Sequence, residues 1–281
     1  MYSTSYNGIY VNWGGGGTAI VTDTPLRVGT IQGTCSSLHL YAPSNTYRQL
    51  NGWNQTYSPY GMTANIHFYM NFAFYTPSTC SISGTSVWDF HGTEQTIASF
   101  NSYGGGSSGS MISTNGPGRL NIRQTRGWDS EAKSASGHLD FSCACSFKGE
   151  MSLNMTGTKR LIVTSQSTAT GCVDVAESAI LCFTNNASWA TATNVAVRGN
   201  AVVEAYNGAV LGRDTDLTLA DSGKWKFCGN GPYVQRVRYL WMDDRRYKTG
   251  RFTSANAPAH VEGNGAILVL GDGSGLTVIF R

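Results

Sequence analysis

A repeat of about 22 residues between Val173 and Phe227 constrains the fold of this chain more than any other feature of its sequence. Each repeat begins with an apolar–polar–apolar triplet and carries a second apolar pair a short distance further on. Alternation with a period of two residues is typical of a strand that is buried on one face. The triplets are Val173-Asp174-Val175, Val195-Ala196-Val197 and Leu217-Thr218-Leu219, and the pairs are Leu181/Phe183, Val203/Ala205 and Trp225/Phe227, with Cys182, Glu204 and Lys226 expected to point outward between the members of each pair.

A repeat of this length indicates a solenoid, in which each coil packs only on its neighbours. Two strands per repeat, separated by polar turns such as Gly199-Asn200 and Ser222-Gly223, describe one coil of a parallel β-helix. Crossovers between parallel strands are right-handed in nearly all sheets. We therefore predict an all-β fold, a right-handed parallel β-helix (β-solenoid) with coils of about 20–22 residues.

The composition agrees with this fold. Of the 281 residues only 13% are charged and 34 are glycine, which favours strands and tight turns over long surface helices. A hydrophobic content of 41% excludes a disordered chain. The net charge of +3 is too small to indicate a nucleic-acid partner, and no apolar stretch approaches the length of a membrane span.

The pattern divides the chain into two parts. Residues 1–80 are rich in Gly and Tyr, and we expect them to form an N-terminal cap with irregular first coils, because the open end of a solenoid exposes strand edges. Residues 81–281 are expected to form the regular β-helix with a C-terminal capping segment. Within this part, Trp88, Trp225 and Trp241 occupy inward positions of the pattern. Six aromatic residues are expected in turns or loops, where they would either stack on sugar rings or cap the solenoid: Trp13, Trp53, Tyr57, Tyr60, Trp128 and Trp189.

The seven cysteines cannot all pair within the chain, because their number is odd. Cys143 and Cys145 lie two positions apart in an apolar run and point to the same side of a strand, so we interpret them as core residues. A zinc site there would need two further ligands from a facing cysteine or histidine pair. The sequence leaves the disulfide state and the redox compartment open for all seven: Cys35, Cys80, Cys143, Cys145, Cys172, Cys182 and Cys228.

The densest charge cluster is Asp243-Asp244 followed by Arg245-Arg246. Inverting glycoside hydrolases need two carboxyl groups about 6.5–9.5 Å apart, whereas adjacent residues on a strand point to opposite faces. Two interpretations are open for Asp243, Asp244 and Arg245: a tight turn with local salt bridges, or a carbohydrate-active site. We favour the tight turn. Further basic residues extend this region, and they would either meet an anionic glycan or membrane or provide solvated edge charge that blocks end-to-end growth of the solenoid: Lys224, Lys226, Arg236, Arg238, Lys248 and Arg251.

Two other patterns carry little chemistry. Gly105-Gly106-Ser107-Ser108-Gly109 matches G-x-S-x-G, but it lies in a Gly/Ser-rich turn and not between a strand and a helix, as a nucleophile elbow requires. The five histidines lack the spacing of a zinc site such as H-x-x-x-H. We therefore assign no catalytic, cofactor-binding or metal-ligating residue, and we expect no cofactor. The histidines are His39, His67, His91, His138 and His260.

Three segments contain motifs similar to those of a known protein family. Residues 87–100, VWDFHGTEQTIASF, resemble the W-D-L-N-G-x-N-Q-T-I-x-S-L segment of autotransporter-associated β-strand repeat proteins. Residues 158–163 (TKRLIV), 173–175 (VDV) and 179–181 (AIL) are similar to the G-T-L-T-L … T-x-V-x-x-G-T-L coil of that family. Residues 251–258 (RFTSANAP) and 263–270 (GNGAILVL) resemble its G-T-Y-T-S-A-N-A-P … G-x-G-x-L-V-V ending.

This resemblance covers roughly residues 80–271. It implies a secreted or surface-displayed right-handed β-helix, and it transfers no family-wide catalytic residue. We therefore expect a non-enzymatic structural or adhesive module whose partners are surface glycans or further copies of itself. Two alternatives stay open: a carbohydrate-active β-helix (polysaccharide lyase or glycoside hydrolase), and a phage-spike-like adhesin, which would be a trimer. Met1-Tyr2-Ser3-Thr4 lacks the basic start of a secretory signal, so we expect a truncated or engineered start.

Overall fold

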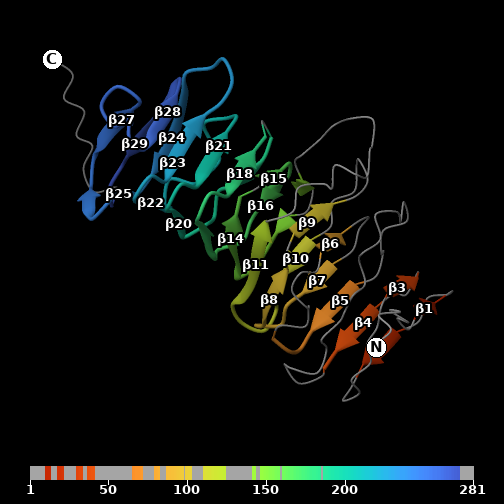
Figure 1. Cartoon of the computed structure of the whole chain (residues 1–281). Coiled ribbons are helices and arrows are strands. Elements are labelled where there is room, and N and C mark those ends of the chain that lie inside the picture. Colours follow the sequence, from red (N-terminus) through yellow and green to blue (C-terminus); the bar gives the residue numbers. More distant parts are fainter. Residues whose placement is uncertain are drawn as a thin grey trace, which may run out of the picture.

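The computed structural model describes most of the chain after residue 86 and shorter segments before it. The described residues are 10–13, 18–21, 30–33, 37–41, 65–71, 79–82, 87–97, 99–102, 110–124, 141–143, 146–158, 160–184 and 186–272. Within them all regular structure is β-strand, and parallel strands stack as a β-solenoid of about six turns. The predicted all-β solenoid is confirmed, and Figure 1 shows the coils following one another from β1 to β27. This described part contains no helix of the length and apolarity that a membrane span requires.

The first side of the coils is a six-stranded parallel sheet with the order β13-β10-β7-β5-β4-β2. Strands from both sides of the predicted boundary at residue 80 belong to this sheet, and the boundary itself stays a prediction. In the next coils the same side carries the very short strands β16 (Gln166–Ser167) and β19 (Ser188–Trp189), which pair with each other. The sheet consists of β2 (Thr18–Val21), β4 (Ser37–Leu40), β5 (Asn65–Phe68), β7 (Val87–Asp89), β10 (Ser110–Ile112) and β13 (Ser146–Phe147).

The second side is an eight-stranded sheet with the order β26-β25-β22-β20-β17-β14-β11-β8. Its strands are parallel except at the end, where β26 pairs antiparallel with β25. The strands are β8 (Glu94–Ile97), β11 (Gly118–Gln124), β14 (Met151–Gly157), β17 (Cys172–Val175), β20 (Asn194–Val197), β22 (Asp216–Leu219), β25 (Tyr239–Met242) and β26 (Arg245–Tyr247).

The third side is a six-stranded parallel sheet with the order β12-β15-β18-β21-β23-β28. Its strands are β12 (Phe141–Cys143), β15 (Arg160–Val163), β18 (Ile180–Phe183), β21 (Val202–Ala205), β23 (Lys224–Phe227) and β28 (Val261–Gly263). Smaller sheets complete the described structure: β1 (Tyr10–Trp13) with β3 (Thr30–Gly33), β6 (Thr79–Ile82) with β9 (Ser99–Ser102), and β24 (Tyr233–Val237) with β29 (Gly265–Val269) and β27 (Gly250–Thr253).

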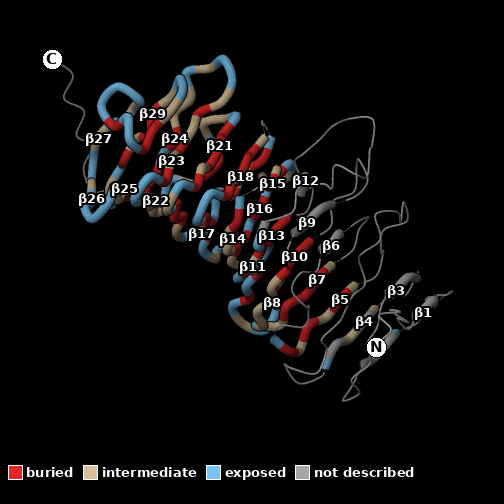
Figure 2. Tube along the Cα trace, viewed as in Figure 1, coloured by how far each residue is buried: buried red, intermediate tan, exposed pale blue. Residues whose placement is uncertain are grey.

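The strand register reproduces the repeat of the sequence. On the second side Val173 pairs with Val195 and Val195 with Leu217, and on the third side Val203 pairs with Trp225. Each inward residue therefore stacks on its equivalent one coil away. Figure 2 shows buried residues on strand after strand along the solenoid, as expected when every coil leaves its apolar side chains to be covered by the next.

Trp241 corrects one prediction, because it lies one position away from an inward site. Leu240 and Met242 are buried, and Trp241 between them is only half-buried. Leu217 pairs with Leu240 and not with Tyr239, so this coil is longer by a single position than the repeat predicts. Since side chains alternate along a strand, such a shift moves the whole set to the opposite face. The other two tryptophans predicted inside, Trp88 and Trp225, are buried.

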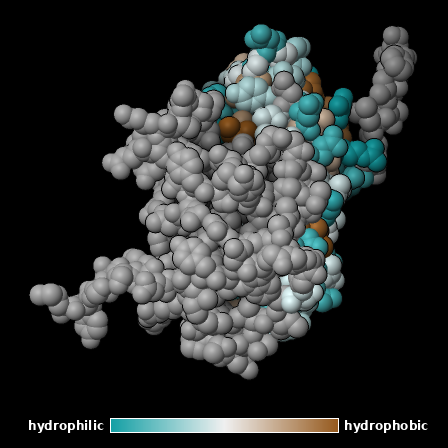
Figure 3. Space-filling view, turned by 90° about the vertical axis from the view of Figure 1, so that its right-hand side faces the viewer, coloured by the Kyte–Doolittle hydropathy of each residue, from teal (hydrophilic) through white to brown (hydrophobic). Residues whose placement is uncertain are grey.

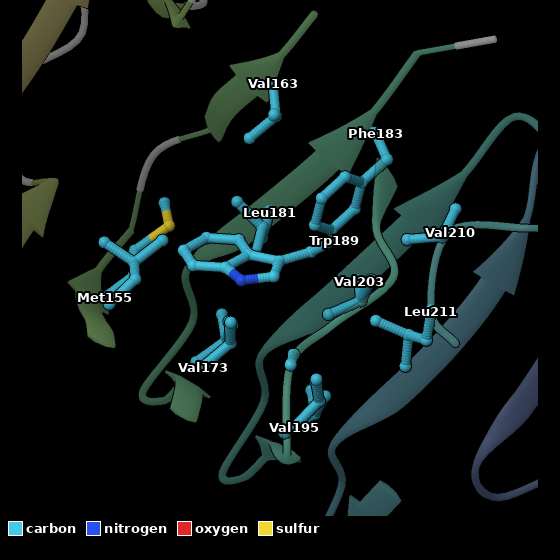
Figure 4. Close-up of a cluster of buried hydrophobic side chains, with 14 of the residues drawn as sticks. Met155, Val163, Val173, Leu181, Phe183, Trp189, Val195, Val203, Val210 and Leu211 are labelled. Carbon is cyan, nitrogen blue, oxygen red and sulfur yellow. The ribbon is translucent and has the colours of Figure 1, made fainter. Parts of the chain in front are cut away.

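Trp189 corrects a second prediction. It was expected in a loop, but its side chain is fully buried, as Figure 4 shows among the surrounding apolar side chains. The indole stacks on the ring of Phe147 with centroids 4.6 Å apart, and its Nε1–H donates to the carbonyl of Ala169 over 2.9 Å. The reason is that the strand on the first side of this coil, β19, is too short for alternation to show in the sequence.

Candidate functional site

The predicted cluster Asp243, Asp244 and Arg245 lies where β25 turns into β26. Met242 pairs with Arg245, so the two aspartates form the hairpin turn between them, and Asp243 has a left-handed φ of 49°. The Asp243 carboxylate is exposed and lies 3.3 Å from Nε2 of His260, while the Arg245 guanidinium lies over the ring of Tyr247. This arrangement agrees with a tight turn.

A groove of about 610 Å³ lies instead on the outer surface of the third side. Ile180 and Val202, both half-buried, lie next to each other in register at its base. Charged side chains surround them: Arg160, Glu204, Asp221, Lys224, Lys226 and Glu262.

Glu204 is the centre of the charge network in this groove. It was expected to point outward on β21, yet only 4% of it is exposed. Arg160 Nη2 lies 3.0 Å from one carboxylate oxygen of Glu204, and Lys226 Nζ lies 3.2 Å from the other. Neighbouring side chains thus cover an outward position, and two cations offset its buried charge.

Each charged side chain that lines the groove has a partner of opposite charge or a backbone donor on the protein. The hydrogen bond and charge of Glu204 raise the pKa of Lys226, whereas a lysine that acts as a general base needs a lowered pKa. Lys224 pairs with Glu262, and Asp221 accepts a hydrogen bond from the backbone N–H of Gly199. Each of the three carboxylates therefore has a partner on the protein.

A second polar cluster lies on the outer surface of the first side, where three coils repeat one pattern. Residues 37–41 (SLHLY), 65–69 (NIHFY) and 87–91 (VWDFH) pair in register, with alternate residues pointing outward. One column therefore contains His39, His67 and Asp89, and the next contains Tyr41, Tyr69 and His91. The rings stack along the solenoid, with centroids 4.3 Å apart for His39 and His67 and 4.2 Å apart for Tyr41 and Tyr69.

Three ligand atoms meet where the two columns end. His67 Nδ1 lies 2.9 Å from His91 Nε2, and Asp89 Oδ2 lies 3.4 Å from His91 Nε2 and 4.0 Å from His67 Nδ1. His91 adopts a left-handed φ of 47° just after β7, a conformation that is uncommon outside glycine. In the part of the chain that the structure describes, His67, Asp89 and His91 are the one group of three such residues placed closely enough to hold a metal ion.

Asp89 is held in place by the next coil. Its side chain is 5% exposed. Its Oδ1 accepts hydrogen bonds from the backbone N–H groups of His91 and Thr114, and its Oδ2 accepts one from the Thr114 hydroxyl over 2.9 Å. The Thr114 oxygen also lies 2.9 Å from Nδ1 of His91, so this hydroxyl connects the carboxylate to the far side of the imidazole.

Burial and neighbouring charge affect the ionisable groups of this cluster. Burial lowers the pKa of His67, and His39 and His91 lower it further, while Asp89 acts in the opposite direction. Burial also raises the pKa of Tyr69, with contributions from the hydrogen bond and charge of Tyr41. His67 therefore favours the neutral imidazole, the form that binds metals and hydrogen-bond donors.

Residue spacing within a single strand or helix does not reveal this cluster. His39, His67 and Asp89 are far apart in the sequence and come from three successive coils, yet they are in register. Alignment of the three segments SLHLY, NIHFY and VWDFH on their alternating apolar residues would have revealed the columns. The groove was missed for the same reason, since its residues also come from several coils.

The remaining sequence candidates have varied outcomes. Among the described cysteines, Cys172, Cys182 and Cys228 are thiols that form no disulfide, and Cys182 is buried. Trp13 was expected in a turn or loop, but it is the last residue of β1, so that prediction is wrong. The side chains of Trp13, Cys80 and Cys143 are not among the described ones, whereas their backbones belong to strands. Several other candidates lie wholly outside the described residues: Gly105 to Gly109, Cys35, Cys145, Trp53, Tyr57, Tyr60, Trp128 and His138.

Comparison with known proteins gives no relative for this chain. No family model matches it, and neither the curated proteins nor the solved structures contain a significant match.

Proposed function

We propose that this protein is a non-enzymatic, secreted or surface-displayed β-solenoid that acts as a structural and adhesive module and contacts glycans through the groove on its third side. The observation that carries the proposal is the position of Glu204, whose buried carboxylate is held between Arg160 and Lys226. A carboxylate engaged by two cations fixes the positions of three side chains on this surface.

The chemistry of the groove suits a sugar chain. Sugar hydroxyls donate and accept hydrogen bonds, and the groove offers both carboxylate acceptors and ammonium donors. Ile180 and Val202 add apolar surface for the C–H face of a pyranose ring. The three cations Arg160, Lys224 and Lys226 balance the three carboxylates Glu204, Asp221 and Glu262, which favours a neutral glycan over a strongly anionic one.

Membership of the autotransporter-associated β-strand repeat family is part of this proposal. It is supported by the motifs of residues 87–100 and 251–270 and by a fold of stacked parallel coils. On the face seen in Figure 3, the visible described residues are mostly hydrophilic or neutral, with a few hydrophobic residues among them.

The test combines binding with turnover on one panel of polysaccharides. We expect saturable binding of at least one neutral glycan without release of reducing or unsaturated ends. Binding should weaken at least about tenfold in Lys226→Met, because the substitution removes a donor and leaves Glu204 with one cation fewer. Arg213→Met, which changes an exposed cation outside the groove, is the matched control.

Two results would contradict the proposal. Cleavage of a polysaccharide that Glu204→Gln abolishes would establish the carbohydrate-active alternative. Equal binding by wild type and Lys226→Met would exclude the groove as the contact surface. Sedimentation of the same samples separates the phage-spike-like alternative, which requires a trimer.

A further inference from the structure

The three ligand atoms of His67, Asp89 and His91 enclose a space of the size of a metal ion. The separations of 2.9, 3.4 and 4.0 Å define a triangle whose equidistant point lies about 2.0 Å from each atom, which matches zinc–nitrogen and zinc–oxygen bonds of about 2.0–2.2 Å. A tetrahedral site would place the two nitrogens about 3.3 Å apart, so the histidine rings need to separate by only a few tenths of an ångström.

The donor set selects a class of ion. Two imidazole nitrogens and one carboxylate oxygen suit Zn²⁺ and the neighbouring divalent transition metals, whereas Ca²⁺ and Mg²⁺ require mainly oxygen ligands. Three protein ligands leave a further coordination position for water. Because the imidazoles of His67 and His91 come from neighbouring coils, an ion bound between them would link the coils.

Thr114 provides the outer contact that histidine ligands commonly have. Coordination through Nε2 requires that Nδ1 of His91 carry the proton, and the Thr114 oxygen lies 2.9 Å from that nitrogen as an acceptor. The same hydroxyl donates to Asp89 Oδ2. A single side chain of the following coil thus contacts two of the three ligands, and the Asn115 side-chain nitrogen also lies 3.1 Å from Nδ1 of His91.

The charge of Asp89 supplies an independent argument. A buried carboxylate is costly unless a cation or a metal offsets it. Among the described residues the ion-pair partners of Asp89 are His67 and His91 alone, with neither a lysine nor an arginine in contact. In the groove, by contrast, Glu204 is buried to the same degree and has two permanent cations.

From this geometry we propose that His67, Asp89 and His91 bind a divalent transition-metal ion of the zinc class, which joins the coils of β5 and β7. This site is separate from the groove and does not depend on the proposed function. The ion would cross-link two coils in the half of the solenoid where coil lengths are irregular. The irregularity is seen in the step from His39 to His67, which is longer than the step from His67 to Asp89. Binding of such an ion to the folded state alone raises the stability of that state.

The alternative is a hydrogen-bonded cluster without metal, in which one imidazole N–H donates to the other imidazole. The deciding experiment is calorimetric titration of the chelator-treated, reduced 281-residue protein with Zn²⁺, together with thermal unfolding in the presence of Zn²⁺, Mg²⁺ or Ca²⁺. We expect one Zn²⁺ per chain and an upward shift of the unfolding temperature with Zn²⁺ alone.

Four substitutions locate the ion. His67→Gln, His91→Gln and Asp89→Asn should each weaken Zn²⁺ binding by at least about tenfold. Loss of a residue that only contacts a ligand already costs about that much affinity, and loss of the ligand itself should cost at least the same. His39→Gln is the matched control, because it removes a ring stacked on His67 without removing a ligand. His67 is the most exposed of the three ligands, so His67→Gln remains informative if Asp89→Asn does not fold.

The seven cysteines require a spectroscopic check, since thiolates also bind zinc. With Co²⁺ as the probe, the proposed site should give visible d–d bands without a thiolate-to-cobalt charge-transfer band, and His67→Gln should abolish them. No saturable binding, binding that persists unchanged in His67→Gln and His91→Gln, or a thiolate band at the first equivalent would each overturn the proposal.

Discussion

At the scale of single residues, positions that are equivalent in the repeat differ in the burial and charge of their side chains. Cys182, Glu204 and Lys226 follow one another in register on the third side, and they are a buried thiol, a buried carboxylate and a half-buried ammonium. The backbone is the same at all three positions. The differences come from the side chains around them, since Arg160 reaches Glu204 from two coils away.

Cys228 allows this coupling to be measured. Burial raises the pKa of its thiol, and the negative charge of Glu204 raises it further. A higher pKa leaves less thiolate at pH 8, so iodoacetamide should modify Cys228 more slowly than the exposed Cys172. Glu204→Gln should accelerate the modification of Cys228 several-fold, as read by peptide mass spectrometry.

The control for this experiment is Glu262→Gln, which removes a carboxylate of the same groove that does not act on Cys228. If Cys228 reacts as fast as Cys172, or if both glutamine variants behave alike, the proposed coupling between Glu204 and the thiol is wrong.

At the scale of elements, one of the shortest strands of the coil makes a large contribution to the core. β19 includes Trp189, which is fully buried against Phe147 and hydrogen-bonded to Ala169. A strand this short has no periodicity, so its inward residue cannot be recognised by alternation. The longer strands on the other two sides show their alternation clearly, as the burial pattern of β14 illustrates.

Two tryptophan substitutions test this assignment. Trp189→Ala should lower the free energy of unfolding by about 3–5 kcal/mol, because it leaves a large cavity in the core. Trp241→Ala removes a half-buried ring and should cost about 1–2 kcal/mol. Urea denaturation of both variants gives the comparison, and equal losses would show that Trp189 is not a core residue.

At the scale of the whole molecule, the solenoid must protect the end of its longest sheet. The antiparallel strand β26 covers the edge of β25, and it carries Arg245 and Arg246 as exposed residues. Arg246 also lies over the ring of Tyr239, with its guanidinium carbon 3.7 Å from the ring centroid. Charge at a sheet edge opposes pairing with a second chain, which agrees with the edge interpretation of this basic region.

Removal of this charge should promote self-association. The double substitution Arg245→Thr/Arg246→Thr keeps a strand-forming residue at both positions and removes two charges from the edge. We expect larger species in sedimentation velocity at high protein concentration. The charge-matched control is Arg123→Thr/Arg213→Thr, at exposed positions away from β26. If both double variants sediment like the wild type, the charge on β26 does not protect the edge.

The sequence by itself determined the solenoid, the position of its regular coils and, within the coils from Val173 to Phe227, the inward residues of the second and third sides. These follow from alternation and a constant repeat, which are local properties that every coil shows separately. The tertiary structure decided three things: the outward position of Trp241, the burial of Trp189, and the meeting of His67, Asp89 and His91. Each depends on the length of a coil or on contacts between coils. Coil lengths vary in the strand register, with a shorter step from Leu153 to Val173 than from His39 to His67, so only the stacking itself places residues of different coils next to each other.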